Sequence, residues 1–213
     1  MVESRKKILD KYCDYLCEKG HSPVTVFAFC KELKIDESKF YDNFSSFKTL
    51  ESNIFELFFK NANSLLEKDK NYDEADSQNK LLAFYYTFFE VLQNNRTLVT
   101  LLLPSDDKKW MTSPVLKRLK SHFQDYIDTL GIEISFLQNT PLSSYQDKGI
   151  RSIAWLQLIK TIEFWMKDES KGFEKTDVYI EKSLRASFDL IHKNPFESLL
   201  DFGKFVYQEN VKK

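Results

Sequence analysis

The sequence predicts an all-helical protein, and three of its features support this prediction. Only 5 of the 213 residues are Gly and 5 are Pro, so turns are few and the elements between them must be long. In most of these long segments the apolar residues recur every three or four positions, which is the period of an α-helix. Apolar residues make up 42% of the chain and charged residues 30%, a balance typical of a globular protein with a packed core. We therefore expect helices packed on helices rather than a many-stranded sheet.

Four helices are expected in the N-terminal part of the chain. Their spans are 3–19, about 25–33, about 36–43 and, for a long fourth helix, about 46–67. Gly20 is expected to end the first helix, Asp36 to cap the third, and Ser45 or Ser46 to cap the fourth. The residues expected on the apolar face of the fourth helix are Leu50, Ile54, Leu57, Phe58 and Leu65.

Further helices are expected after the charged stretch 68–77, which contains no large aliphatic residue and marks a boundary. Their spans are 78–95, 97–103, 113–130, 143–167, about 176–192 and a last amphipathic segment over 196–208. Thr176 or Asp177 is expected to cap the helix over 176–192. We expect an N-terminal domain over 1–48 and a larger C-terminal domain over 49–213, with the fourth helix linking them.

Net charge and hydropathy exclude several classes of protein. The formal net charge is −1, so any contact with DNA must come from local geometry rather than from a basic chain. No apolar run approaches the roughly 20 residues that a membrane span needs, and no signal peptide is visible behind Met1. The cysteines are an odd set, Cys13, Cys17 and Cys30, which argues against a disulfide framework. A cytoplasmic location is therefore expected.

Three short helices followed by a long one, with a tight corner between the second and third, form the helix-turn-helix arrangement. In residues 5–60 this arrangement resembles the TetR family of bacterial transcriptional regulators. At the corner, Lys34-Ile35-Asp36 stands where the family usually has Gly-Val-Ser. The other residues that carry the resemblance are Ile8-Leu9-Asp10, Glu18-Lys19-Gly20, Thr25-Val26, Phe40-Tyr41-Asp42-Asn43-Phe44 (the family's Phe-Tyr-x-x-Phe) and Ser46-Phe47-Lys48-Thr49-Leu50 (its Ser-Lys-x-x-Leu).

The resemblance implies a TetR-repressor-like fold, with a helix-turn-helix domain for DNA and a larger helical domain for ligand binding and dimerisation. It implies a homodimer that places the third helix of each subunit in the major groove. Carried over residue by residue, it assigns phosphate contacts to Thr25, Tyr41 and Lys48. Asn43 could pair with adenine, and Lys39 could serve guanine or phosphate. Lys34 completes the set of expected DNA-binding residues.

The sequence departs from the family pattern in ways that favour an alternative. The presumed recognition helix carries Asp36, Glu37 and Asp42, which repel phosphates. Phe47 stands where the family has Lys, and Lys48 follows one place later. The alternative is a protein of this fold that no longer binds DNA and instead binds a lipid or isoprenoid, or a partner protein. The amphipathic segment 196–208 also favours it. A third possibility is a dimeric interaction module without a ligand.

The chain contains 19 Phe, 10 Tyr and 3 Trp, which is many for its length. Aromatic side chains from several helices can line a cavity for a small apolar ligand, although most must simply form the core. His122 could contact such a ligand or be a hydrogen-bonded core histidine. The candidate ligand-binding residues are Phe84, Phe88, Trp110, His122, Phe123, Tyr126 and Trp155.

The helices expected over 143–167 and 176–192 are those with which the family pairs two subunits. Their apolar residues exceed what one core face needs, which favours a self-complementary two-fold interface over burial within a monomer. The candidate interface residues are Ile159, Ile162, Trp165, Met166, Leu184, Phe188 and Ile191.

Catalytic and metal chemistry are not indicated. Cys13, Cys17 and His21 are spaced four apart and could suggest a metal or thiol sensor, but the Cys-x-x-Cys spacing typical of structural zinc is absent. Cys13, Cys17 and Cys30 fall where the family places buried Leu or Ala, so packing in the interior is favoured. The sequence has no Gly-rich phosphate loop and no recognisable nucleophile–base pair. We therefore expect no enzyme activity, no cofactor and no metal.

Overall fold

The computed structural model describes residues 2–103, 108–134 and 146–192, and within these ranges the chain is helical and contains no strand. This confirms the predicted all-helical fold class. The α-helices are α1 (Val2–Lys19), α2 (Val26–Leu33), α3 (Glu37–Tyr41), α4 (Phe47–Leu66), α5 (Lys70–Glu74), α6 (Ser77–Gln93), α7 (Arg96–Leu102), α8 (Lys117–Thr129), α9 (Gln146–Met166) and α10 (Glu174–His192). Short 3-10 helices lie at Lys108–Thr112 (η1), Pro114–Leu116 (η2) and Lys171–Phe173 (η5). None of the described helices is both long and apolar enough to cross a membrane.

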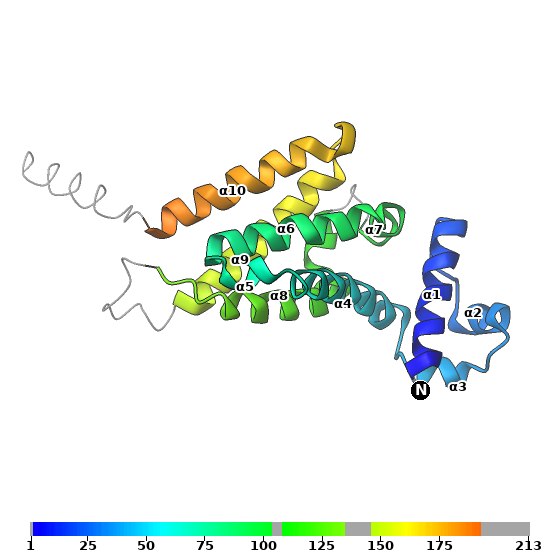
Figure 1. Ribbon diagram of the computed structural model, residues 1–213. Helices are drawn as coiled ribbons and strands as arrows, with labels where there is room; N and C mark the ends of the chain where they lie inside the picture. The colour runs from blue at the N-terminus through cyan, green and yellow to red at the C-terminus, as the bar shows by residue number, and fades with distance from the viewer. Residues whose placement is uncertain (1, 104–107, 135–145, 193–213) are drawn as a thin grey trace, which may run out of the picture.

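The helices form a small N-terminal group and a larger bundle (Figure 1). Helices α1, α2 and α3 lie together at one end of the molecule, and α4 runs from them into the bundle. There α4 packs against α6 and α8, α8 packs against α9, and α10 covers α6 and α9. Helix α7 reaches back to contact α1, so the two groups touch at a second place besides α4.

Local signals explain where several helices begin. Ser46 caps α4, because its Oγ accepts a hydrogen bond from the Thr49 amide at 3.2 Å. Asp36 stands at the N-cap of α3, but contrary to expectation its carboxylate makes no capping hydrogen bond and stays exposed. Helix α10 begins at Glu174, ahead of the expected caps, because Asp168 accepts hydrogen bonds from the Thr176 amide (2.9 Å) and hydroxyl (2.7 Å).

Some expected elements differ from the observed ones. The boundary stretch 68–77 contains α5, and the expected helix over 113–130 is split into η2 and α8. The segment 196–208 lies outside the described residues. Leu57 and Leu65 were expected on the buried face of α4, but they are 43% and 50% exposed. Leu50, Ile54 and Phe58 are buried as expected, but the prediction was wrong for Leu57 and Leu65, because the contacts of α4 with α6 and α8 bury Phe55, Phe59 and Ala62 in their place.

Arg96 fastens α7 to the end of α9. Its guanidinium donates hydrogen bonds to the backbone carbonyls of Trp165 and Met166, both at 3.1 Å. The same guanidinium lies 4.6 Å from the ring centroid of Trp165 and 4.5 Å from that of Phe173. A cation that binds the last carbonyls of a helix and two aromatic faces stabilises that helix end. Arg96 therefore holds the corner between α9 and α10 against α7.

A buried carboxylate on α4 holds α4 against α8. Glu56 is 9% exposed, and its Oε2 accepts a hydrogen bond from Arg118 Nη1 at 2.8 Å. Its Oε1 accepts one from Lys60 Nζ at 2.6 Å and lies 3.2 Å from His122 Nε2. Burial alone would raise the pKa of Glu56, but the hydrogen bonds from Lys60, Arg118 and His122 outweigh it and lower the pKa to about 2. Glu56 is therefore charged in the folded chain at neutral pH.

We expect Glu56→Gln to lower the free energy of unfolding by about 2 kcal/mol at pH 7, because charge-assisted hydrogen bonds are lost. The folded-state pKa is depressed, so the stabilisation is present above the ordinary value of 4.5 and is lost as the pH falls toward about 2. Urea unfolding at several pH values should therefore show the gap between wild type and variant closing below pH 4.5. The matched control is Glu90→Gln, an exposed glutamate on α6. An equal loss in both variants, or a gap that does not change with pH, would contradict the assignment.

Candidate functional site

A cluster of aromatic rings holds the short helix α3 in place. A five-residue helix is too short to be stable alone, so its position depends on side-chain packing. Phe40 of α3 is fully buried, with ring centroids of Phe47 at 5.5 Å and Phe29 at 6.4 Å. Phe47 in turn stacks on Tyr12 of α1 at 5.2 Å. The cluster thereby fixes α3 against α1, α2 and the start of α4.

Two polar groups border this cluster. Burial raises the pKa of the Tyr12 hydroxyl, as does the hydrogen bond that it donates to the Glu51 carboxylate at 2.6 Å. The guanidinium of Arg5 lies 4.8 Å from the Phe44 ring centroid and donates hydrogen bonds to the Asn43 carbonyl (3.4 Å) and to Asn53 Oδ1. Arg5 therefore ties α1 to the corner between α3 and α4. Sequence analysis did not single out Arg5, because its role depends on a long-range contact.

The structure leaves most of the expected DNA-binding side chains on the surface. Lys34, Lys39 and Lys48 are exposed, and none forms an ion pair within the described ranges. Tyr41 is 53% exposed although Phe40 and Phe44 on either side of it are buried. Because Phe40 and Phe44 pack into the core, the ring and hydroxyl of Tyr41 face solvent.

The other two expected DNA-binding residues already have local roles. The Thr25 hydroxyl accepts a hydrogen bond from the Ala28 amide at 3.1 Å and so caps α2. Asn43 Nδ2 donates to the Lys39 carbonyl at 2.8 Å, which closes the end of α3. Lys34 closes α2 with a φ of 56°, in the left-handed region that favours glycine. This is the corner position where the family that the sequence resembles has Gly.

Acidic and apolar side chains share this surface with the lysines. Asp36 and Asp42 are exposed, and Glu37 is half-buried. Phe27 of α2 is 61% exposed and Val24 is 88% exposed. Sequence analysis missed both, although Phe27 lies off the stripe that Val26, Phe29, Cys30 and Leu33 form at the helical period. Phe47, in place of the family's Lys, packs into the aromatic cluster and leaves only Lys48 to supply a cation at the start of α4.

The aromatic residues expected to bind a ligand fall into two groups. Phe84, Phe88 and Phe123 are fully buried and pack ring against ring. The ring centroid of Phe84 lies 5.5 Å from that of Phe88 and 5.5 Å from that of Phe123. Trp110 is buried, and Trp155 is half-buried at 6.5 Å from Phe123. His122 and Tyr126 instead line an open cleft of about 460 Å³.

This cleft, called here the α4–α8 cleft, lies between the C-terminal half of α4 and helices α5, α6 and α8. The residues that line it include Phe59, Glu67, Tyr72, Asp73, Lys80, His122, Asp125 and Tyr126. The hydroxyl groups of Tyr72 and Tyr126 lie 2.7 Å apart, and Tyr126 donates to the Lys80 carbonyl at 3.1 Å. The ring of His122 stacks on Phe59 at 5.7 Å. The cleft thus combines aromatic surface with carboxylates on three separate segments.

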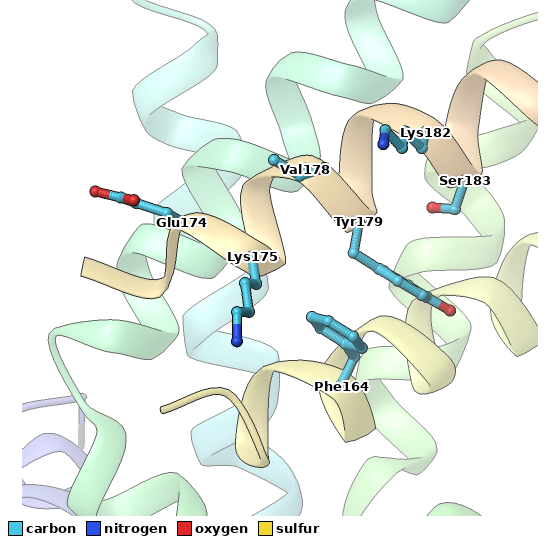
Figure 2. A pocket seen from close by; sticks show the side chains of 7 residues that line it. All are labelled: Phe164, Glu174, Lys175, Val178, Tyr179, Lys182 and Ser183. Carbon is cyan, nitrogen blue, oxygen red and sulfur yellow. The ribbon is translucent and has the colours of Figure 1, made fainter. Parts of the chain in front are cut away.

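A second hollow, the α9–α10 groove, has a volume of about 650 Å³. Figure 2 shows Phe164 of α9 and Tyr179 of α10 lying together at this groove, with ring centroids 4.4 Å apart and nearly parallel. The other residues that line it are Glu174, Lys175, Val178, Lys182 and Ser183, all on α10.

The apolar residues of α9 and α10 divide between the core and the surface. Of the expected interface residues, Ile191 is half-buried, and six are buried within the chain: Ile159, Ile162, Trp165, Met166, Leu184 and Phe188. The large apolar side chains that these two helices expose are Ile153 (61%), Leu156 (57%), Val178 (48%) and Leu190 (61%). The surface of α9 and α10 that is open to a partner is therefore made of other residues than those the sequence suggested.

The cysteines do not behave alike. Cys30 is buried and Cys13 is half-buried, and burial raises the pKa of the Cys13 thiol to about 12. Cys17 is exposed, contrary to the expectation that it packs in the interior, because the buried stripe of α1 runs through Ile8, Tyr12 and Leu16. Among the described residues, no three His, Cys, Asp or Glu side chains gather as a metal ion would require.

Comparison with known proteins gives one match. The family described as "Tetracyclin repressor-like, C-terminal domain" matches residues 80–206, more than half of the chain. The match begins within α6 and includes α7 to α10, so it covers a part of the chain that lies beyond residues 5–60, where the sequence resemblance was found. No curated protein and no solved structure matches the chain.

The aromatic cluster generates a prediction about Phe47. We expect Phe47→Ala to lower the free energy of unfolding by about 2 kcal/mol, because a half-buried ring that packs against Tyr12, Phe29 and Phe40 is lost. Phe27→Ala is the matched control, since Phe27 is 61% exposed and its removal should change stability by less than about 0.5 kcal/mol. Chemical unfolding followed by circular dichroism measures both. Similar losses for the two variants would show that Phe47 does not belong to the core.

Proposed function

The chain belongs to the TetR family, and we propose that it is a ligand-responsive transcriptional regulator that binds DNA as a homodimer. The observation that carries this proposal is the division of the run 40–44, in which Phe40 and Phe44 are buried and Tyr41 is exposed. An exposed tyrosine hydroxyl is free to donate a hydrogen bond to a DNA phosphate, and Tyr is one of the side chains that make such contacts. The order of helices α1 to α4 supports the same proposal.

DNA would be contacted by α3, the N-terminus of α2 and the start of α4. Helix α3 would enter the major groove, and Tyr41 and Lys48 would hold phosphates on either side of it. Lys34 and Lys39 would add positive charge close to the groove, offsetting the exposed carboxylates of Asp36 and Asp42. Arg5 would act indirectly, because it holds the Asn43 backbone and thereby the end of α3.

The homodimer would form through the exposed surface of α9 and α10. Ile153, Leu156, Val178 and Leu190 are the large apolar side chains that these two packed helices leave exposed, and burying them against a partner would be favourable. Two antiparallel helices from each subunit can form a four-helix interface about a two-fold axis. The α9–α10 groove, with Phe164 and Tyr179 in it, would receive side chains of the partner subunit.

The ligand would bind in the α4–α8 cleft. Phe59 and Asn63 on α4 and Glu67 at its C-cap line this cleft. A ligand that contacts α4 more favourably in one orientation than in another shifts the population toward that orientation. Because α4 also carries Lys48, such a shift changes the spacing between the two DNA-binding surfaces of the dimer.

A second function is favoured by specific observations at the same surface. Asp36 and Asp42 are exposed, the family's Lys is replaced by the packed Phe47, and Val24 and Phe27 are exposed apolar residues. These features suit a protein of this fold that binds a lipid or isoprenoid, or a partner protein, and no longer binds DNA. The DNA-binding measurement below separates the two functions.

Binding to the DNA upstream of the protein's own gene should be tight and should weaken steeply as salt rises. We expect Lys48→Ala to weaken binding about tenfold and to reduce the salt slope by about one, because one phosphate contact is lost. Tyr41→Phe should also weaken binding, because only the hydroxyl is removed. Fluorescence anisotropy at several salt concentrations measures both effects.

The control for Lys48 is Lys117→Ala, an exposed lysine on α8 that should leave DNA binding unchanged. If wild-type protein fails to bind DNA even at low salt, the regulator function is wrong. The second function would then stand, and mass spectrometry of co-purified lipid would be the next measurement.

The proposed interface is tested with Leu156→Glu. In a two-fold interface each subunit contributes one copy of the new carboxylate, and both charges must be desolvated when the apolar surfaces meet. We therefore expect the dimer to dissociate to monomers. Leu65→Glu is the control, because Leu65 is similarly exposed (50% against 57%) but lies on α4. Analytical ultracentrifugation should give a monomer for the first variant and a dimer for the second and for wild type. A Leu156→Glu dimer would place the interface elsewhere.

A further inference from the structure

We propose that the α4–α8 cleft binds an organic cation, a positively charged nitrogen or phosphorus centre that carries an apolar body. The inference rests on the proposed ligand-binding function and names the class of ligand. Sequence analysis suggested a largely apolar ligand, but the residues that line this cleft combine negative charge with aromatic rings. Both features select for positive charge.

The charges of the cleft are unbalanced. Glu67 at the C-cap of α4, Asp73 of α5 and Asp125 of α8 line the cleft and face a single ammonium group, that of Lys80. Within the described residues, the carboxylates of Asp73 and Asp125 take part in no hydrogen bond or ion pair, and Glu67 accepts only from Asn63 Nδ2 at 3.1 Å. A cation in the cleft would be attracted by carboxylates from three different segments.

The aromatic surface of the cleft already accepts a cation from the protein itself. The Lys80 ammonium lies 5.9 Å from the ring centroid of Tyr72, within the range of a cation–π interaction. The ring of His122, half-buried and stacked on Phe59, supplies further aromatic surface, whereas Phe59 and Tyr126 are 6% and 8% exposed and border the cleft with their edges alone. A rigid apolar body can therefore pack against rings while its charged centre faces the carboxylates, an arrangement that neither a neutral lipid nor an anion would use fully.

The two tyrosines also keep the cleft free of additional charge. Burial is the main cause that raises the pKa values of both Tyr72 and Tyr126, so both remain neutral hydroxyls. The Tyr126 hydroxyl donates to the Lys80 carbonyl at 3.1 Å and lies 2.7 Å from the Tyr72 hydroxyl. The Tyr72 oxygen keeps a lone pair that can accept a hydrogen bond from an N–H of the ligand.

Because the carboxylates lie on different segments, binding of a cation would move these segments relative to one another. A cation that attracts Glu67, Asp73 and Asp125 draws together the end of α4, α5 and α8. An anion or a neutral ligand in the same cleft would have no such effect. The sign of the ligand's charge is therefore what the cleft would sense.

Isothermal titration calorimetry with two probes tests the proposal. Tetraphenylphosphonium and tetraphenylborate have the same shape and apolar surface and opposite charge. We expect the phosphonium ion to bind with one site per chain and the borate ion not to bind. The double variant Asp73→Asn/Asp125→Asn should bind the phosphonium ion about tenfold more weakly, because two attractive charges are removed. Tyr72→Leu should weaken binding, whereas Tyr72→Phe, which keeps the ring, should largely retain it.

The matched control is Asp10→Asn/Glu90→Gln, which also removes two exposed negative charges but at positions outside the cleft. It should bind the phosphonium ion as wild type does, and circular dichroism should show all variants equally folded. Equal affinity for the two probes, or an Asp73→Asn/Asp125→Asn affinity equal to wild type, would overturn the proposal. Cation binding without DNA binding would leave this site standing and reject the regulator function. DNA binding without cation binding would reject the cation site and leave the regulator function standing.

Discussion

The carboxylate of Glu56 lies where α4 passes from the N-terminal group of helices into the bundle, and it holds α4 against α8 through Arg118, Lys60 and His122. A carboxylate that is 9% exposed is stable there only because these partners satisfy it. The orientation of α4 relative to α8 depends on this arrangement. So do the width of the α4–α8 cleft, which the two helices line, and the direction in which Lys48 extends at the other end of α4.

Position 47 illustrates how packing and function compete for a single residue. A cation at the first residue of α4 would face DNA, but the aromatic ring of Phe47 stacks on Tyr12 and contacts Phe29 and Phe40 instead. The N-terminal group thereby gains a larger aromatic core, and Lys48 is the cation that remains at the start of α4. In the DNA complex proposed above, the surface lysines would be offset by Asp36 and Asp42, so affinity would depend on the geometry of few groups.

Helical periodicity predicted the fold class and the spans of most helices, because few Gly and Pro residues interrupt the pattern. It could not predict which apolar residues remain exposed on the surface. Leu57, Leu65 and Leu156 follow the same spacing as buried neighbours, and only the placement of other helices leaves them exposed. For the same reason Phe84 and Tyr126 look alike in sequence, although one lies in the core and the other borders the cleft. Arg5 and the Glu56 cluster escaped sequence analysis because long-range contacts define them, whereas the exposure of Phe27 could have been predicted from its place off the apolar stripe of α2.

Helix α4 is continuous over 20 residues, a length of about 30 Å. Glu56 divides it almost at its centre, with Lys48 toward one end and Glu67 just beyond the other. A rigid rod pivoting at its midpoint moves both ends equally and in opposite directions, so a tilt of roughly 10° displaces each end by about 3 Å. In the proposed homodimer the corresponding points of two such rods would move apart together, which would double the change. The proposed response to a ligand would then need only a tilt of one helix and no refolding.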